Sequence, residues 1–260
     1  MEKSLCKAGL AVYPVNPGVM EILGHTGYPD LTASPEVGDI VDIFRRSEDG
    51  RRIVQTDSKI NAKVIWMQQG IINEEAWKNT DVADDFFMVL PQDTGKANEL
   101  SEIRMTYDDK NLYLAATFYN STVGDYYVES LRRDFSFGKN DNFLVFIDPF
   151  NNLTTGFSFG TNAAGAQWDG TMYGGGKVDL NWDSKWISEV KRDKEKWVFE
   201  MAIPFKSIRY KDGVTEWGIN FSRLDLKSSE KSSWTPIPRQ FPTASLAYTG
   251  VLVWDAPPPS

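Results

Sequence analysis

The sequence predicts an all-β protein: an antiparallel β-sandwich, with immunoglobulin-like or jelly-roll-like layers, behind an irregular N-terminal extension. Three observations predict this class. Short segments rich in β-branched and aromatic residues recur roughly every ten residues after residue 61, as in sandwiches. Turn-forming sequences, such as Asp-Asp-Lys-Asn at 108–111, separate these segments. Few segments show the apolar spacing of an amphipathic helix.

Residues 1–57 differ from the rest of the chain. Prolines stand at positions 14, 17, 29 and 35, and no strand-like alternation occurs before the sequence GDIVDIFRR. The sequence EDGRRIV around Gly50 predicts a tight turn, because the glycine of an Asp-Gly pair accepts positive φ. We expect an irregular or poorly integrated extension here, with a separate small domain as the alternative. The sandwich is expected over residues 58–255, and the sequence APPPS at 256–260 is typical of a linker stub.

Strands are expected throughout the first half of the sandwich. Residues 103–107 and 112–119 predict a hairpin, because both are rich in β-branched and aromatic residues. Residues 143–148 form a nearly continuous apolar run, which is typical of a strand buried on both faces. It ends at Pro149, which cannot donate a hydrogen bond to a neighbouring strand. A further strand is expected over 155–161.

The second half begins with a glycine-rich segment at 162–181, which predicts a loop. Residues 186–190 and 197–203 predict another hairpin, around the turn sequence Asp-Lys-Glu-Lys. The next strand is expected over 217–223 and the last over 248–254.

Charge and composition exclude several classes of function. The net charge of −8 and the pI near 4.8 argue against nucleic acid as a partner, because phosphates attract basic surfaces. One cysteine, Cys6, excludes an internal disulfide and a multi-thiolate metal site. One histidine, His25, excludes haem ligation by two histidines and argues against histidine-based catalysis. Nine tryptophans, within an aromatic content of 13%, indicate stacking surfaces beyond the needs of a core.

Four sequence motifs together resemble one family. They are GIINEEAW at 70–77, NDNFLVFIDPF at 140–150, WVFEMAIPF at 197–205 and WGINFSRLDLKSSEKSSWTPIPR at 217–239. Residues 59–254 resemble family 9 carbohydrate-binding modules, and most closely the N-terminal module of Bacteroidetes-type envelope proteins of unknown function. Those proteins carry a C-terminal outer-membrane-like β-barrel, which is absent from this sequence.

The resemblance implies a non-catalytic module that binds a carbohydrate. It also implies a parent protein that binds or degrades glycans, with a role in carbohydrate catabolism, located in the periplasm or outer membrane. No signal peptide is evident in the sequence. The C-terminal β-barrel is an expected partner, alongside the carbohydrate ligand. No cofactor and no haem are expected.

In the family, two aromatic rings enclose one sugar. The resemblance places Phe135 or Phe137 at the first ring position and Trp234 at the second. Core packing is the alternative for the two phenylalanines, and packing beneath the crossover at Pro236 and Pro238 is the alternative for Trp234.

Polar residues with the chemistry to bind sugar hydroxyls stand near the family motifs. Arg132 and Arg133 precede Asp134, and a salt bridge from this pair to Asp134 or Asp141 is the alternative. Within the glycine-rich segment, Trp168 is favoured for binding because a tryptophan in an exposed loop has little to pack against. The complete set of expected ligand-binding residues is Arg132, Arg133, Asp134, Phe137, Asp141, Asn162, Trp168, Tyr173, Arg223, Asp225 and Trp234.

Other functions remain open from the residues alone. A glycoside hydrolase would need two carboxylates about 5–9.5 Å apart, and no motif marks such a pair among the 36 acidic residues. An interaction domain for a missing β-barrel, without any sugar ligand, is a further alternative, as is a hydrolase-associated membrane fragment. A structural calcium ion is also kept as an alternative, because turns near residues 108, 148–152 and 179–183 are rich in oxygen ligands. In this family the opening motif usually carries acids where Gln69 and Asn73 stand, which argues against calcium at that loop.

Overall fold

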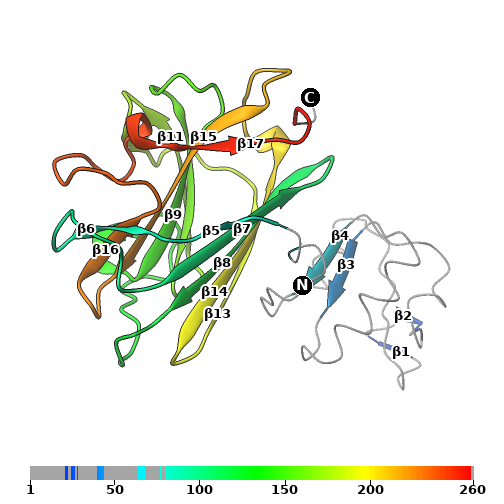
Figure 1. Ribbon diagram of the computed structural model, residues 1–260. Helices are drawn as coiled ribbons and strands as arrows, with labels where there is room; N and C mark the ends of the chain where they lie inside the picture. Colours follow the sequence, from blue (N-terminus) through cyan, green and yellow to red (C-terminus); the bar gives the residue numbers. More distant parts are fainter. Residues whose placement is uncertain are drawn as a thin grey trace. The chain divides into compact units, whose positions relative to one another are not determined.

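The computed structural model describes residues 21–22, 25–26, 28, 40–43, 64–67, 77 and 80–258. The chain divides into two compact units, Met1–Ile71 and Ile72–Ser260. Both are drawn in Figure 1.

Two short strand pairs are described in the first unit. Strands β1 (Glu21–Ile22) and β2 (His25–Thr26) are antiparallel. Strands β3 (Ile40–Ile43) and β4 (Val64–Met67) are parallel, with Ile40 opposite Val64. Parallel neighbours require a long crossover rather than a hairpin turn, so β3 and β4 form part of a different architecture from the antiparallel second unit.

The second unit is an antiparallel sandwich of two sheets, as the sequence predicts (Figure 1). The larger sheet has the strand order β12-β11-β10-β9-β15-β16-β6, and β17 pairs with the first half of β15. Its strands are β6 (Phe87–Leu90), β9 (Asn142–Asp148), β10 (Gly156–Asn162), β11 (Gln167–Tyr173), β12 (Lys177–Asp179), β15 (Glu216–Asp225), β16 (Glu230–Ser233) and β17 (Gly250–Val253). Three one-turn 3₁₀ helices, η2 (Phe137–Lys139), η3 (Phe205–Ser207) and η4 (Leu246–Tyr248), lie in the connections.

The smaller sheet has the order β13-β14-β8-β7-β5. Its strands are β5 (Val82–Ala83), β7 (Ser101–Tyr107), β8 (Asn111–Tyr119), β13 (Ile187–Arg192) and β14 (Lys196–Pro204). Both predicted hairpins, β7–β8 and β13–β14, are confirmed. An aspartate closes each turn: the Asp108 carboxylate accepts hydrogen bonds from two backbone N–H groups, and the Asp193 carboxylate does the same.

The main core lies between the two sheets. Phe143 on β9 packs against Phe118 on β8, with ring centroids 4.7 Å apart, and Phe118 in turn packs against Trp197 at 4.2 Å. Each fully buried side chain of this size contributes roughly 1.5–3 kcal/mol to folding. Every residue of β9 is buried, which confirms the prediction of a central strand covered on both faces.

A second apolar cluster covers the opposite side of the larger sheet, which we call its outer face. Leu144 and Phe146 alternate along β9 with the core residues and therefore point away from the smaller sheet. The cluster consists of Phe135, Leu144, Phe146, Ala166, Trp168, Met172 and Leu246, all buried. Apolar clusters therefore cover both faces of the larger sheet over β9, β10 and β11.

The predicted glycine-rich loop at 162–181 is wrong in part, because β11 and β12 occupy half of it. Gly170 marks close strand packing rather than a loop: a Cβ there would lie 2.6 Å from the Asp179 carbonyl oxygen on β12. Trp168 consequently lies in a strand and is buried in the outer-face cluster instead of exposed. No helix in the part of the chain that the structure describes has the length and apolar character needed to cross a membrane.

Candidate functional site

Arg223 and Asp225, two of the expected ligand-binding residues, lie in a buried polar network. Arg223 is 1% exposed and donates to the carbonyl oxygens of Leu100 and Tyr119, each at 2.8 Å. Its guanidinium also pairs with the Asp225 carboxylate at 3.1 Å. Burial lowers the pKa of Arg223, while Asp225 and Glu99 act in the opposite direction. Arg223 therefore ties the larger sheet to the connections of the smaller one.

Asp141 and Asn162 also hold backbone in place. The Asp141 carboxylate accepts hydrogen bonds from the N–H groups of Tyr127 and Leu226, at 2.9 and 2.6 Å. The Asn162 side chain accepts two more backbone hydrogen bonds, from the turn that follows it, and donates to the Ser130 carbonyl oxygen at 2.7 Å. Both side chains are buried, and both brace the long crossover that precedes β9.

Arg133 forms a separate ionic cluster. It pairs with buried Asp169 and with Asp183, the latter at 2.9 Å, and donates to the Gln167 side chain at 2.8 Å. Burial raises the pKa of Asp169, and it also raises the pKa of Asp134, which adopts a left-handed backbone conformation beside it. Arg132 points into solvent. The acids that pair with Arg133 are therefore Asp169 and Asp183, rather than Asp134 or Asp141.

The aromatic residues expected to enclose a sugar lie on opposite faces of the larger sheet. The Trp234 ring packs against Phe221 in the main core, at 5.5 Å. Phe137, by contrast, is 47% exposed and lies beneath the amine of Lys231 on the outer face. Tyr173 is 50% exposed at the end of β11. The structure does not join Phe137 and Trp234 in one site.

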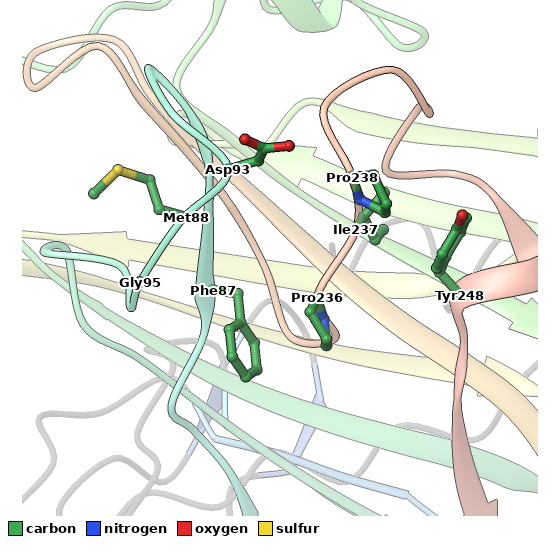
Figure 2. A pocket seen from close by; sticks show the side chains of 8 residues that line it. All are labelled: Phe87, Met88, Asp93, Gly95, Pro236, Ile237, Pro238 and Tyr248. Atoms are coloured by element: carbon green, nitrogen blue, oxygen red, sulfur yellow. The ribbon is translucent and has the colours of Figure 1, made fainter.

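An open pocket at the edge of the larger sheet is the candidate site. Its volume is about 300 Å³, and we call it the edge pocket. It is lined by Phe87, Met88, Asp93, Gly95, Pro236, Ile237, Pro238 and Tyr248 (Figure 2). One wall is edge strand β6 with the loop that follows it, and the other is the segment between β16 and β17.

Local structure on β6 sets the direction of Phe87. A register shift in the β16–β6 ladder leaves Phe87 and Leu90 half-buried on the outer face, while Met88 and Val89 between them are buried. Figure 2 shows the Phe87 and Met88 side chains pointing away from each other. The Lys96 amine lies 3.8 Å from the centroid of the Phe87 ring, so this ring already contacts a cation.

The opposite wall combines stiff backbone with an aromatic rim. Pro236 and Pro238 restrict the backbone here, and the N–H of Arg239 donates to the Asp93 carboxylate at 2.9 Å, which ties the two walls together. The Tyr248 ring packs against Phe241 at 5.1 Å. Phe241 is exposed, so it extends the aromatic rim towards solvent.

The edge pocket can bind a polar ligand with flat apolar faces. Aromatic rings from both walls offer stacking surfaces, the Tyr248 hydroxyl can donate or accept, and Asp93 supplies a carboxylate. Because Asp93 uses Oδ2 for Arg239, its Oδ1 is left for a ligand. Among the described residues, no group of three or more histidine, cysteine, aspartate or glutamate side chains gathers in a way that could hold a metal ion.

Sequence reasoning missed Phe87, Asp93 and Tyr248. They come from segments about 150 residues apart along the chain, which the β16–β6 pairing and the Arg239–Asp93 hydrogen bond bring together. The available signal was the proline-rich crossover at Pro236 and Pro238, which the sequence analysis considered only as a cover for Trp234.

Two family models match the chain. The model described as carbohydrate family 9 binding domain-like matches residues 69–238, and the model described as CoA binding domain matches residues 2–83. The second match spans the expected N-terminal extension, and residues 69–83, with the motif GIINEEAW, lie inside both. The uncharacterized protein YneT of Bacillus subtilis (strain 168) is 37% identical over 78 residues. That alignment covers 30% of this chain and only 58% of YneT.

Solved structures share the fold. A putative carbohydrate-binding protein from Bacteroides uniformis has a TM-score of 0.54 at 14% identity, covering 83% of this chain and 96% of that one. A family 9 carbohydrate-binding module from Caldicellulosiruptor kristjanssonii, in complex with cellotriose, has a TM-score of 0.51 at 10% identity, covering 84% and 93%. A family 9 carbohydrate-binding module from the same organism, in complex with glucose, has a TM-score of 0.51 at 11% identity, covering 72% of this chain and 90% of that one. Since the first family model spans well over half of the sequence, and the sandwich agrees with it, the chain belongs to the carbohydrate family 9 binding domain-like family.

Proposed function

We propose that the second unit is a non-catalytic carbohydrate-binding module and that the sugar occupies the edge pocket. One observation carries the proposal: the pocket places the Phe87 and Tyr248 rings and the Asp93 carboxylate around about 300 Å³ of open space. Pockets of this size hold small ligands, and sugars bind where a ring supports their C–H face and polar groups hold their hydroxyls.

Membership of the family supports this proposal, and so does the sugar chemistry of structural relatives. Family 9 modules of the same fold from Caldicellulosiruptor kristjanssonii were solved with cellotriose and with glucose. The position of this module within a glycan-degrading protein of the periplasm or outer membrane, with a further C-terminal domain as its partner, stays a prediction from the sequence resemblance.

Calorimetric titration of the full chain with glucose and cellotriose, preceded by a glycan array, tests the proposal. We expect Tyr248→Ala to weaken binding about five- to tenfold, because one stacking face is lost. Tyr173→Ala is the matched control, since it removes an exposed tyrosine from the end of β11. The proposal fails if no sugar binds, or if both variants bind like the wild type.

Coenzyme A binding by the first unit is a second candidate function. The CoA binding domain model matches residues 2–83, and the parallel pair β3–β4 is the sheet arrangement of nucleotide-binding α/β folds. The alignment covers only 58% of YneT. Titration of coenzyme A into the full chain therefore tests whether the matched part is enough to bind coenzyme A. An absence of binding at millimolar coenzyme A contradicts the candidate without affecting the sugar proposal.

A further inference from the structure

We propose that the glycan bound at the edge pocket carries a negatively charged substituent, a carboxylate or a sulfate, and that Lys231 binds this group beside Phe137. This inference rests on the proposed function and specifies its ligand. It follows from the position of Lys231, from its lack of an acidic partner, and from its distance to the pocket.

Lys231 lies on the outer face of the larger sheet. Its Cα partners are Leu224 on β15 and Leu90 on β6, so the side chain is flanked by two leucines. Leu224 alternates with Arg223 and Asp225, which face the smaller sheet, and this alternation places Leu224 and Lys231 outside. The amine lies 5.3 Å from the centroid of the Phe137 ring.

The Lys231 amine has no acidic partner in the part of the chain that the structure describes, whereas the exposed lysines Lys96 and Lys139 and the buried Lys227 each lie near a carboxylate. Lys96 pairs with Asp85, Lys139 pairs with Glu129, and Lys227 lies 3.9 Å from Asp225. Over residues 80–258 no carboxylate lies within ion-pair distance of Lys231, although the chain carries a net charge of −8. Lys231 is thus a half-buried cation without a counter-charge among the described residues, although the protein as a whole is acidic.

An incoming anion would gain from this environment. Burial lowers the pKa of Lys231, because the ammonium is incompletely solvated where it stands. A charge-assisted hydrogen bond to a carboxylate or sulfate replaces the missing hydration, and it is stronger in a partly dehydrated setting than in bulk water. The exposed face of Phe137 beside the amine supplies a platform for the sugar ring that bears the anion.

Lys231 is close enough to the edge pocket for one short glycan to contact both. Ser233 stands two positions along β16, which corresponds to roughly 7 Å, and its Cα partner is Phe87 in the pocket wall. Lys231, Leu90 and Phe87 therefore share one outer-face surface. A sugar seated against Phe87 can direct a substituent, or a neighbouring residue, to the Lys231 amine.

The experiment compares three ligands that differ only at C6 of each sugar. They are cellotriose, the β-1,4-linked glucuronic acid trimer, and 6-O-sulfated cellotriose, each titrated into the full chain. We expect the better anionic ligand to bind about tenfold more tightly than cellotriose in the wild type. Comparison of the carboxylated and the sulfated ligand then identifies which anion is preferred.

Lys231→Gln is expected to abolish that preference while cellotriose binding stays within about twofold. Lys231→Arg retains the charge and should retain the preference, which separates charge from folding. Lys194→Gln, in the exposed β13–β14 turn, removes the same charge elsewhere and is the control. Equal wild-type affinity for all three ligands, or a preference that survives Lys231→Gln, overturns this inference and leaves the proposed function intact. If none of the ligands binds, the inference falls together with the proposed function.

Discussion

The network around Arg223 and the edge pocket contain similar residue types but differ in what their polar atoms contact. In the network, Arg223 meets carbonyl oxygens and Asp225, and Glu99 accepts hydrogen bonds from Ser121. The charged side chains of Arg223, Asp225 and Glu99 are all buried, and each of these contacts is internal to the protein. In the edge pocket, Asp93 and the Tyr248 ring line open space, and the neighbouring Phe241 ring is exposed. The hydrogen bond from the Arg239 N–H to Asp93 connects the two walls. Residue type alone therefore does not distinguish a structural site from a binding site. The two sites differ in whether their polar groups already have hydrogen-bond partners within the protein.

The strongest way to test this comparison is to break the network. Arg223→Met should destabilise the protein by about 3–5 kcal/mol, because it leaves the buried Glu99 carboxylate without its cation and Asp225 with Lys227 alone, at 3.9 Å. Urea unfolding followed by tryptophan fluorescence measures this change. Arg132→Met, at an exposed arginine, should stay within about 0.5 kcal/mol. Comparable losses in both variants would contradict a structural role for Arg223.

Trp234 belongs with the structural region, and Gly250 tests that assignment. A Cβ at position 250 would lie 2.5 Å from the Trp234 ring, so Gly250→Ala should cost about 1–3 kcal/mol through overpacking. At Gly138 a Cβ meets nothing within 4 Å, and Gly138→Ala is the control in the same unfolding assay. An unchanged Tm for Gly250→Ala would indicate that the Trp234 ring is free to move away, as a ligand-binding ring would be.

The edge pocket should show the opposite behaviour, with a loss of binding and little loss of stability. Asp93→Asn retains the side-chain shape and removes the charge, and we expect sugar affinity to fall roughly five- to tenfold. Calorimetry and thermal melting on the same samples give both quantities. A fall in Tm without a fall in affinity would place Asp93 with the structural residues instead.

The smallest expected effect is a pH dependence of stability that comes from the buried acids. Burial raises the pKa of Asp141, Asp169 and Asp134 in the folded protein. The folded state therefore binds protons more readily than the unfolded chain, and the free energy of unfolding should rise as the pH falls from 7 towards the unfolded value near 4. The contribution is lost again as the pH rises through the folded-state pKa values.

Urea unfolding at pH 7, 6 and 5 checks this pH dependence. Repeating the series in high salt separates burial from long-range repulsion among the net −8 charges, which salt screens. A rise in stability that persists in salt supports the burial of these carboxyls. Stability that declines steadily from pH 7 to pH 5 would contradict it.

The sandwich could be predicted from local patterns, whereas much of the site could not. The strand β9 is a continuous apolar run, and the turns at Asp108 and Asp193 carry their own closing residues. By contrast, β16 has the polar sequence EKSS and becomes a strand only because it pairs between β15 and β6. Its first residue, Glu230, accepts hydrogen bonds from the distant backbone of Asn98 and Glu99, a contact that no local pattern encodes.

The candidate site residues divide in the same way. Phe137 was predicted from its place before a motif, and it is exposed on the outer face. Asn162, Trp168 and Arg223 were also expected to bind the ligand, Trp168 because of its place in the glycine-rich segment, but their burial depends on long-range packing around them. Lys231 gave no signal in the sequence, because one lysine among many becomes distinctive only when its neighbours prove to be Leu224, Leu90 and Phe137.

The apolar cluster on the outer face has a consequence for how this module can be altered. Because β9, β10 and β11 are covered on both sides, substitutions there disturb one core or the other. The loop after β6 and the segment between β16 and β17 build the edge pocket. These two connections are therefore the regions where length and sequence can be varied to select a new ligand while the scaffold is kept constant. A library of variants confined to these two connections would change ligand binding while the stability of the scaffold is kept.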